Sequence, residues 1–174
     1  MPHAVPGTKG MSGSGGWLTL LAIATAVDGL LAGASLDQSI KQLPARHRIG
    51  MRAFSAYSRA ADQANGLLLY VLLGVGGAVL TLAAAGWSLA LALPAPETLP
   101  VLLAGGLAIA HTLTTARAAP INWSQRAVAD DEGALALVFR RFELWQSARA
   151  VLQLLTFLVM IWALVLNAHG AMSG

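Results

Sequence analysis

The chain has no cysteine and little charge. The absence of cysteine excludes structural disulfides, thiolate metal sites and a cysteine nucleophile. Only 11% of the 174 residues are charged and 56% are hydrophobic, whereas about a quarter of the residues in an ordinary soluble domain are charged. This composition predicts an integral membrane protein, and the length suits one compact unit.

Acidic residues are also few, which leaves a formal net charge of +3 and a pI near 10. A basic chain can bind nucleic acid, but here the basic residues gather in two polar segments between hydrophobic runs. That placement is typical of loops that face the cytoplasm and the anionic headgroups of its membrane. We therefore expect membrane lipid as a partner and no nucleic acid.

Four hydrophobic runs are long enough to cross a bilayer, because twenty helical residues measure about 30 Å. The short turn at 94–97 makes the second and third spans antiparallel neighbours. We predict an all-α integral membrane four-helix bundle as one domain over 17–168. A flexible Gly- and Ser-rich tail (1–16) and a short tail (169–174) flank it. The predicted spans are 17–36, 66–93, 99–119 and 148–168.

Two polar segments connect the spans, and both contain residues at helical spacing. The stretches 49–61 and 130–149 are predicted to be amphipathic helices in these connections, and the first is either an interfacial helix or an ordinary solvated one. Because the basic residues concentrate in these segments, the multi-pass chain should sit in the cell (inner) membrane with both termini non-cytoplasmic.

Asp28 and His111 are the ionisable residues well inside the predicted spans. Each lies eight residues from the cytoplasmic end of its span, which places both about 12 Å deep. A lone carboxylate at that depth costs several kcal/mol, so we expect the two to meet. With Tyr70 and Gln153 they would form a polar layer. His111 would then be a base supported by Asp28, or the pair would only fix helix register.

A second polar cluster is expected at the cytoplasmic rim. Arg117, Asn122 and Arg149 could bind an anionic headgroup, an enolate or another acidic oxygen of a ligand. The alternative is that these arginines only extend to the membrane interface, as arginines at the ends of spans commonly do.

No metal or cofactor site is expected from the sequence. His3, His47, His111 and His169 are scattered, and no pair has the i, i+4 spacing of ligands on a helix. One membrane histidine cannot supply two axial haem ligands in a monomer. The glycine-rich run 74–79 lies within a predicted span, where glycine indicates helix packing rather than phosphate binding.

Two short stretches carry a family resemblance. The turn Pro120-Ile121-Asn122 and the run RFELWQSARAV at 141–151 resemble the anthrone oxygenase-like family of small four-span membrane proteins. The resemblance implies a four-helix membrane fold, and some relatives oxidise anthrones to anthraquinones with molecular oxygen and no recognised cofactor.

The resemblance also implies roles for the residues that open the last span. A tryptophan, a histidine and an arginine of the family correspond here to Phe142, Gln146 and Arg149. Because the family's histidine is replaced by Gln146, this protein either uses His111 as its base or does not carry out the reaction.

Three functions therefore stay open. The first is a cofactor-independent oxygenase, or a binding protein, for a hydrophobic aromatic or quinone-like small molecule. The second is a small proton-coupled transporter in which Asp28 titrates. The third is a structural or partner-binding membrane protein, because glycine-rich spans also suit a homo-oligomer.

Overall fold

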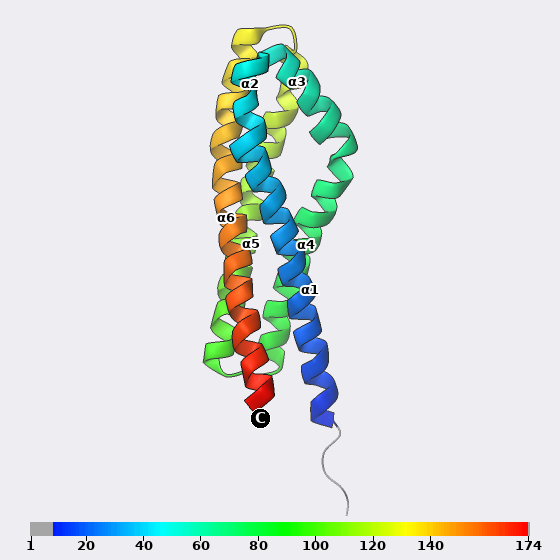
Figure 1. Cartoon of the computed structure of the whole chain (residues 1–174), viewed down its shortest axis with the longest axis vertical. Helices are drawn as coiled ribbons and strands as arrows, with labels where there is room; N and C mark the ends of the chain where they lie inside the picture. Colours follow the sequence, from blue (N-terminus) through cyan, green and yellow to red (C-terminus); the bar gives the residue numbers. More distant parts are fainter. Residues whose placement is uncertain (1–8, 174) are drawn as a thin grey trace, which may run out of the picture.

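The computed structural model describes residues 9–173, and this part of the chain is built from helices without strands. Four of these helices are long and apolar enough to cross a membrane, which confirms the predicted all-α four-helix architecture. The helix that begins the described part and the one that ends it have their outer ends on the same side of the bundle (Figure 1). The four are α1 (Lys9–Asp37), α4 (Leu67–Ala90), α5 (Ala95–Ser124) and α6 (Glu132–Ser173).

The first polar connection is mostly helical. α1 continues through a π-helical turn, η1 (Gln38–Gln42), into α2 (Leu43–Ile49). Pro44 does not interrupt this run because it lies in the first turn of α2, where a missing N–H is tolerated. The helix ends at Gly50, whose φ of 88° lies in the left-handed region that favours glycine. The chain then forms α3 (Met51–Ala60) and a second π-helical turn, η2 (Ala61–Asn65).

The first and last helices, α1 and α6, extend beyond the predicted spans. α6 has 42 residues, about 63 Å at the helical rise, so the amphipathic helix predicted at 130–149 and the last span are one element. No glycine or proline interrupts 134–169, which explains this continuity. α1 already includes 9–16 of the expected N-terminal tail, and α6 includes most of the expected C-terminal one. Residues 1–8 of the tail lie outside the described residues.

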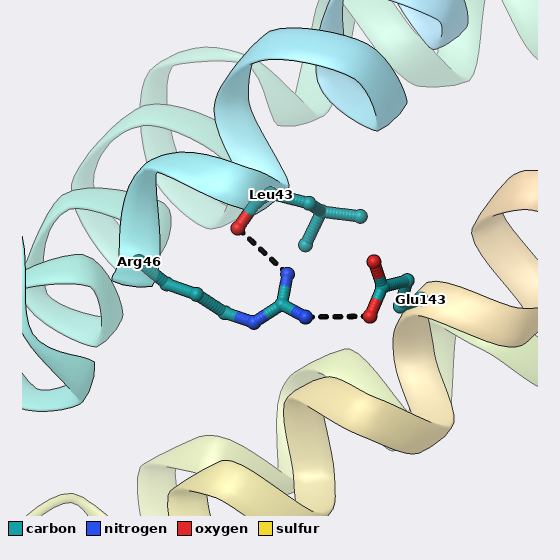
Figure 2. Close-up of polar contacts among 3 residues, drawn as sticks. All are labelled: Leu43, Arg46 and Glu143. Atoms are coloured by element: carbon teal, nitrogen blue, oxygen red, sulfur yellow. Dashed lines mark hydrogen bonds and ion pairs between the residues drawn. The ribbon is translucent and has the colours of Figure 1, made fainter. Parts of the chain in front are cut away.

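The end of the bundle with α2 and α3 is held by an aromatic cluster and an ion pair. Phe54 of α3 meets the ring of Phe139 on α6 edge-on, with 5.0 Å between centroids. Figure 2 shows Arg46 of α2, whose Nη1 donates to the Leu43 carbonyl at 2.6 Å and whose Nη2 donates to Glu143 Oε2 at 2.5 Å. α3 therefore packs against the extension of α6 and does not lie as a separate helix on the membrane interface.

The end of the bundle that carries the outer termini is packed through small side chains. Trp17 is buried there, and its Nε1 donates to Asn167 Oδ1 at 3.0 Å, which joins α1 to α6. Small residues let membrane helices approach closely. We call this region the closed half; its buried core consists of Trp17, Leu21, Ala24, Ala84, Ala85, Val101, Ala104, Met160 and Ala163.

Candidate functional site

α4 leaves its neighbours partway along its length. It is joined to α1 where Thr81 Oγ1 donates to Asp28 Oδ2 at 2.7 Å. One turn earlier, a Cβ on Gly77 would lie only 3.0 Å from Asp28 Oδ1. At Gly74, in contrast, an added Cβ would meet no described atom within 4 Å. Figure 1 shows the beginning of α4, together with α3, bowed away from α1.

The bow has a local cause in η2. A π-helical turn inserts an extra residue, so it bends the helix that contains it, and such turns are frequent at functional sites. Gly66 follows the turn, and its N–H donates to the Ala61 carbonyl at 2.6 Å. A Cβ on Gly66 would also lie 2.6 Å from that carbonyl oxygen. The close approach therefore requires glycine.

The far end of the bow is fixed to the end of α5 and to the connection that follows it. Gln63 Nε2 donates to the Asn122 carbonyl at 2.8 Å, and Arg126 Nε donates to Gln63 Oε1 at 2.7 Å. Ser55 Oγ of α3 donates to Gln125 Oε1 at 2.9 Å. The bowed segment is thus held at both ends and free in the middle.

A cavity of about 550 Å³ lies under the bow. This volume is within the range of small-molecule sites, about 300–1,000 Å³. α1, η1, η2, α4, α5 and α6 all contribute to its wall. The polar residues of the wall are Ser35, Gln38, Asp62, Gln63, Tyr70, His111, Thr112, Thr115, Asn122, Arg149 and Gln153.

The cavity brings together five of the predicted site residues, which come from three different spans. These five line its wall, whereas Asp28, Arg117 and Gln146 do not belong to the described wall. The five are Tyr70, His111, Asn122, Arg149 and Gln153.

His111 lies in the wall without a partner. It is 2% exposed, and among the described residues neither of its ring nitrogens has a hydrogen-bond partner. Asp28 and His111, which we expected to meet, therefore share no hydrogen bond. Asp28 Oδ2 instead accepts from Thr81, because Gly77 lets α4 approach the Asp28 side of α1. Residue counting placed the two groups at one depth but could not give the direction in which each points.

Arg149 is held by the side-chain amides of two glutamines, and its Nε donor is unpartnered among the described residues. Its Nη2 donates to Gln38 Oε1 at 3.1 Å and also to Gln146 Oε1. Gln146 Nε2 in turn donates to the Ser35 carbonyl at 3.3 Å. Arg149 Nε has no partner among the described residues. Gln146 thus orients the arginine from outside the cavity, while Arg117 is exposed elsewhere on α5.

Asp62 is a wall residue that sequence reasoning missed. Ser58 Oγ donates to Asp62 Oδ2 at 2.9 Å. Burial raises the pKa of the Asp62 carboxyl, and hydrogen bonds from Ser58 and Gln38 and the charge of Arg149 oppose that shift. The signal for it was present in the sequence, because Ser58 and Asp62 have i, i+4 spacing directly before the second span.

Within residues 9–173, no group of three or more His, Asp or Glu side chains is placed to hold a metal ion. The fold and the cavity together define a helical membrane protein with an internal cavity whose wall includes buried polar side chains. Comparison with protein-family models, with curated proteins and with solved structures found no match to this chain.

Proposed function

We propose that this membrane protein binds a flat hydrophobic compound that carries a weakly acidic oxygen. The observation that supports the proposal most directly is His111, buried in the wall of a 550 Å³ cavity with both ring nitrogens unpartnered among the described residues. A buried polar group without a partner is costly. A ligand with hydrogen-bonding oxygens would satisfy it.

The cavity supplies the groups that such a ligand needs. One ring nitrogen of a neutral His111 accepts a proton and the other donates a hydrogen bond. The unpartnered Nε–H of Arg149 can donate to an oxygen that gains negative charge. Tyr70 and Gln153 add further polar atoms to the wall.

The resemblance to the anthrone oxygenase-like family extends the proposal to a reaction. In it, His111 removes a proton from the anthrone ring carbon opposite the ketone, and molecular oxygen adds to that electron-rich carbon. Loss of water from the hydroperoxide then gives the quinone. One anthrone and one O₂ yield one anthraquinone and one water. Gln146 replaces the family's histidine, which leaves His111 as the base in this scheme.

The charge distribution supports an orientation for this site. Ten of the eleven lysines and arginines lie from Lys41 onward, in or next to the two polar segments. The end of the bundle that carries α2 and α3 then faces the cytoplasm of a cell (inner) membrane, and both termini are non-cytoplasmic.

The test is oxygenation by the purified protein in mild detergent, with 1,8-dihydroxyanthrone as substrate. Oxygen uptake and quinone absorbance should rise together, one to one, in the wild type. His111→Phe, which keeps an aromatic ring of similar size, should reduce the rate about a hundredfold or more. His47→Phe changes an exposed histidine of α2 and serves as the matched control. Equal rates in the wild type and His111→Phe would refute the proposed role of His111.

A proton-coupled carrier is a second candidate, and one observation favours it. Asp28 is a buried carboxyl inside a span, and its Oδ1 has no partner among the described residues. In this case 1,8-dihydroxyanthrone would bind and cross vesicle membranes unchanged. The flux would depend on pH, and Asp28→Asn would abolish that dependence. Quinone formation without flux would exclude the carrier.

A further inference from the structure

The wall of the cavity has two chemically different parts. Polar groups such as Gln38, Asp62 and Arg149 gather where η1, η2 and α6 meet. The rest is an apolar stripe along α4 and α5. We call it the α4–α5 stripe; it consists of Val71, Val75, Val79, Leu82, Ile109 and Leu113.

The α4–α5 stripe is open to the surroundings of the bundle. Val75 is 60% exposed, Val79 58% and Leu113 64%, although all three line the cavity. A residue can have both properties only at the mouth of a cavity. Because α4 and α5 are membrane spans, the medium at this mouth is lipid hydrocarbon.

The stripe has a defined length and one closed end. Val71, Val75, Val79 and Leu82 follow helical spacing on one face of α4 and cover about 16 Å. α4 and α5 meet beyond it, where a Cβ on Gly105 would lie 3.4 Å from Ala85 Cβ and 3.6 Å from Leu82 Cδ2. The opposite end leads to the polar groups.

The polar end contains an arginine that forms no direct ion pair, although the Asp62 carboxyl lies in the same wall and interacts with it electrostatically. Among the described residues, no carboxylate lies within 4.0 Å of Arg149, whereas Lys41, Arg46 and Arg52 each have an acidic partner. The Arg149 guanidinium instead contacts the neutral side chains of Gln38 and Gln146 and keeps Nε free. A cation next to a membrane cavity favours an anionic ligand.

From these observations we infer that a membrane-dissolved anionic amphiphile enters the cavity sideways, between α4 and α5. Arg149 binds its acidic head, and its apolar body lies along the α4–α5 stripe. This inference rests on the proposed function and deepens it, because it adds the charge of the ligand and the route by which the ligand arrives.

A pair of matched ligands tests the charge. Anthracene-9-carboxylate and 9-anthracenemethanol share one ring system, but only the first is anionic at pH 7.5. Both accept excitation energy from tryptophan, and Trp123 lines the cavity, so titration in detergent reports binding. The wild type should bind the carboxylate at least about tenfold more tightly, as expected for a charge-assisted hydrogen bond.

Two arginine variants test whether Arg149 causes the preference for the carboxylate over the alcohol. Arg149→Gln should reduce it to less than about twofold while the alcohol still binds. Arg117→Gln, which removes an exposed arginine of α5, should leave the preference unchanged. Equal affinity of the wild type for both compounds would overturn the inference and leave the proposed function intact. Binding of neither compound would overturn both.

The route is tested with nitroxide labels, which the cysteine-free chain allows at single introduced cysteines. Val75→Cys lies in the stripe, and Leu72→Cys is an exposed position on the same helix outside the cavity wall. In lipid nanodiscs both labels should collide with oxygen more often than with a water-soluble nickel chelate. Anthracene-9-carboxylate should lower the collisions at residue 75 by about twofold or more, with no change at 72. Strong nickel collisions at 75 would indicate an aqueous mouth and overturn the lateral route.

Discussion

The same four helices pack tightly in one half of the bundle and enclose a cavity in the other. In the closed half, Ala24, Ala84 and Ala104 are fully buried and bring the helices into direct contact. In the other half, which we call the open half, the turn at η2 and the hydrogen bond from the Gln63 side chain to the Asn122 backbone carbonyl hold α4 away from its neighbours. Small residues thus let membrane helices pack in contact, whereas a cavity requires a separate feature, here the π-helical turn and its hydrogen bonds, that keeps the helices apart.

The largest effect should come from placing a leucine side chain in each half. Ala84→Leu inserts three carbons into the closed half, where the side chain is 0% exposed, and should lower the free energy of unfolding by about 1–3 kcal/mol. Gly74→Leu adds a side chain where a Cβ meets no described atom within 4 Å. It should leave the melting temperature nearly unchanged. Thermal melting in one detergent compares the two.

Gly76→Leu is the matched control for the cavity, because Gly76 also has room for a Cβ but lies outside the described wall. Gly74→Leu should weaken anthracene binding and Gly76→Leu should not. Equal loss of stability in Ala84→Leu and Gly74→Leu would contradict the division into a closed and an open half.

The four spans and their order could be predicted because long apolar runs and a four-residue turn determine them. The helix at 130–149 was predicted, but its continuity with the last span was missed, because α6 contains no glycine or proline between 134 and 169. The helical run from α1 through η1 and α2 was missed because no breaker ends it before Gly50. Polarity alone does not end a helix. The runs from 37 to 49 and from 132 to 147 were polar without a stop signal.

The sequence predicted most of the residues of the candidate site, but it did not predict which of them contact one another. Tyr70, His111, Arg149 and Gln153 were found because polar residues in apolar spans are few. The bond from Thr81 to Asp28 depends on the close approach at Gly77, and the cavity depends on the turn at η2. Neither feature leaves a periodic pattern in the sequence.

An intermediate loss of stability should follow from removing the hydrogen bond between Thr81 and Asp28, which lies where the two halves meet. Thr81→Val removes the hydroxyl that donates to Asp28 Oδ2 and should lower the free energy of unfolding by about 0.6 kcal/mol, the average for single hydrogen bonds between membrane helices. Asp28→Asn with Thr81→Val should cost less than the sum of the two single changes, because both remove one interaction. Strict additivity in the melting data would show that the bond does not couple α1 to α4.

The smallest effect concerns pH at the open half. Because burial raises the pKa of Asp62, the folded protein holds that proton more tightly than the unfolded chain. Stability should therefore fall as pH rises from the ordinary aspartate value of 3.8 through the raised folded pKa. Asp62→Asn should flatten this decline in melting temperature between pH 4 and 7. An unchanged slope in Asp62→Asn would exclude Asp62 as its source.

Native mass spectrometry of protein released from nanodiscs tests the central claim, that the open half is a ligand site, most directly. After incubation with anthracene-9-carboxylate, the wild type and Gly76→Leu should each carry one added ligand, and Gly74→Leu should carry none. One ligand on all three proteins would place binding outside the cavity, and bare protein in all three samples would contradict the account.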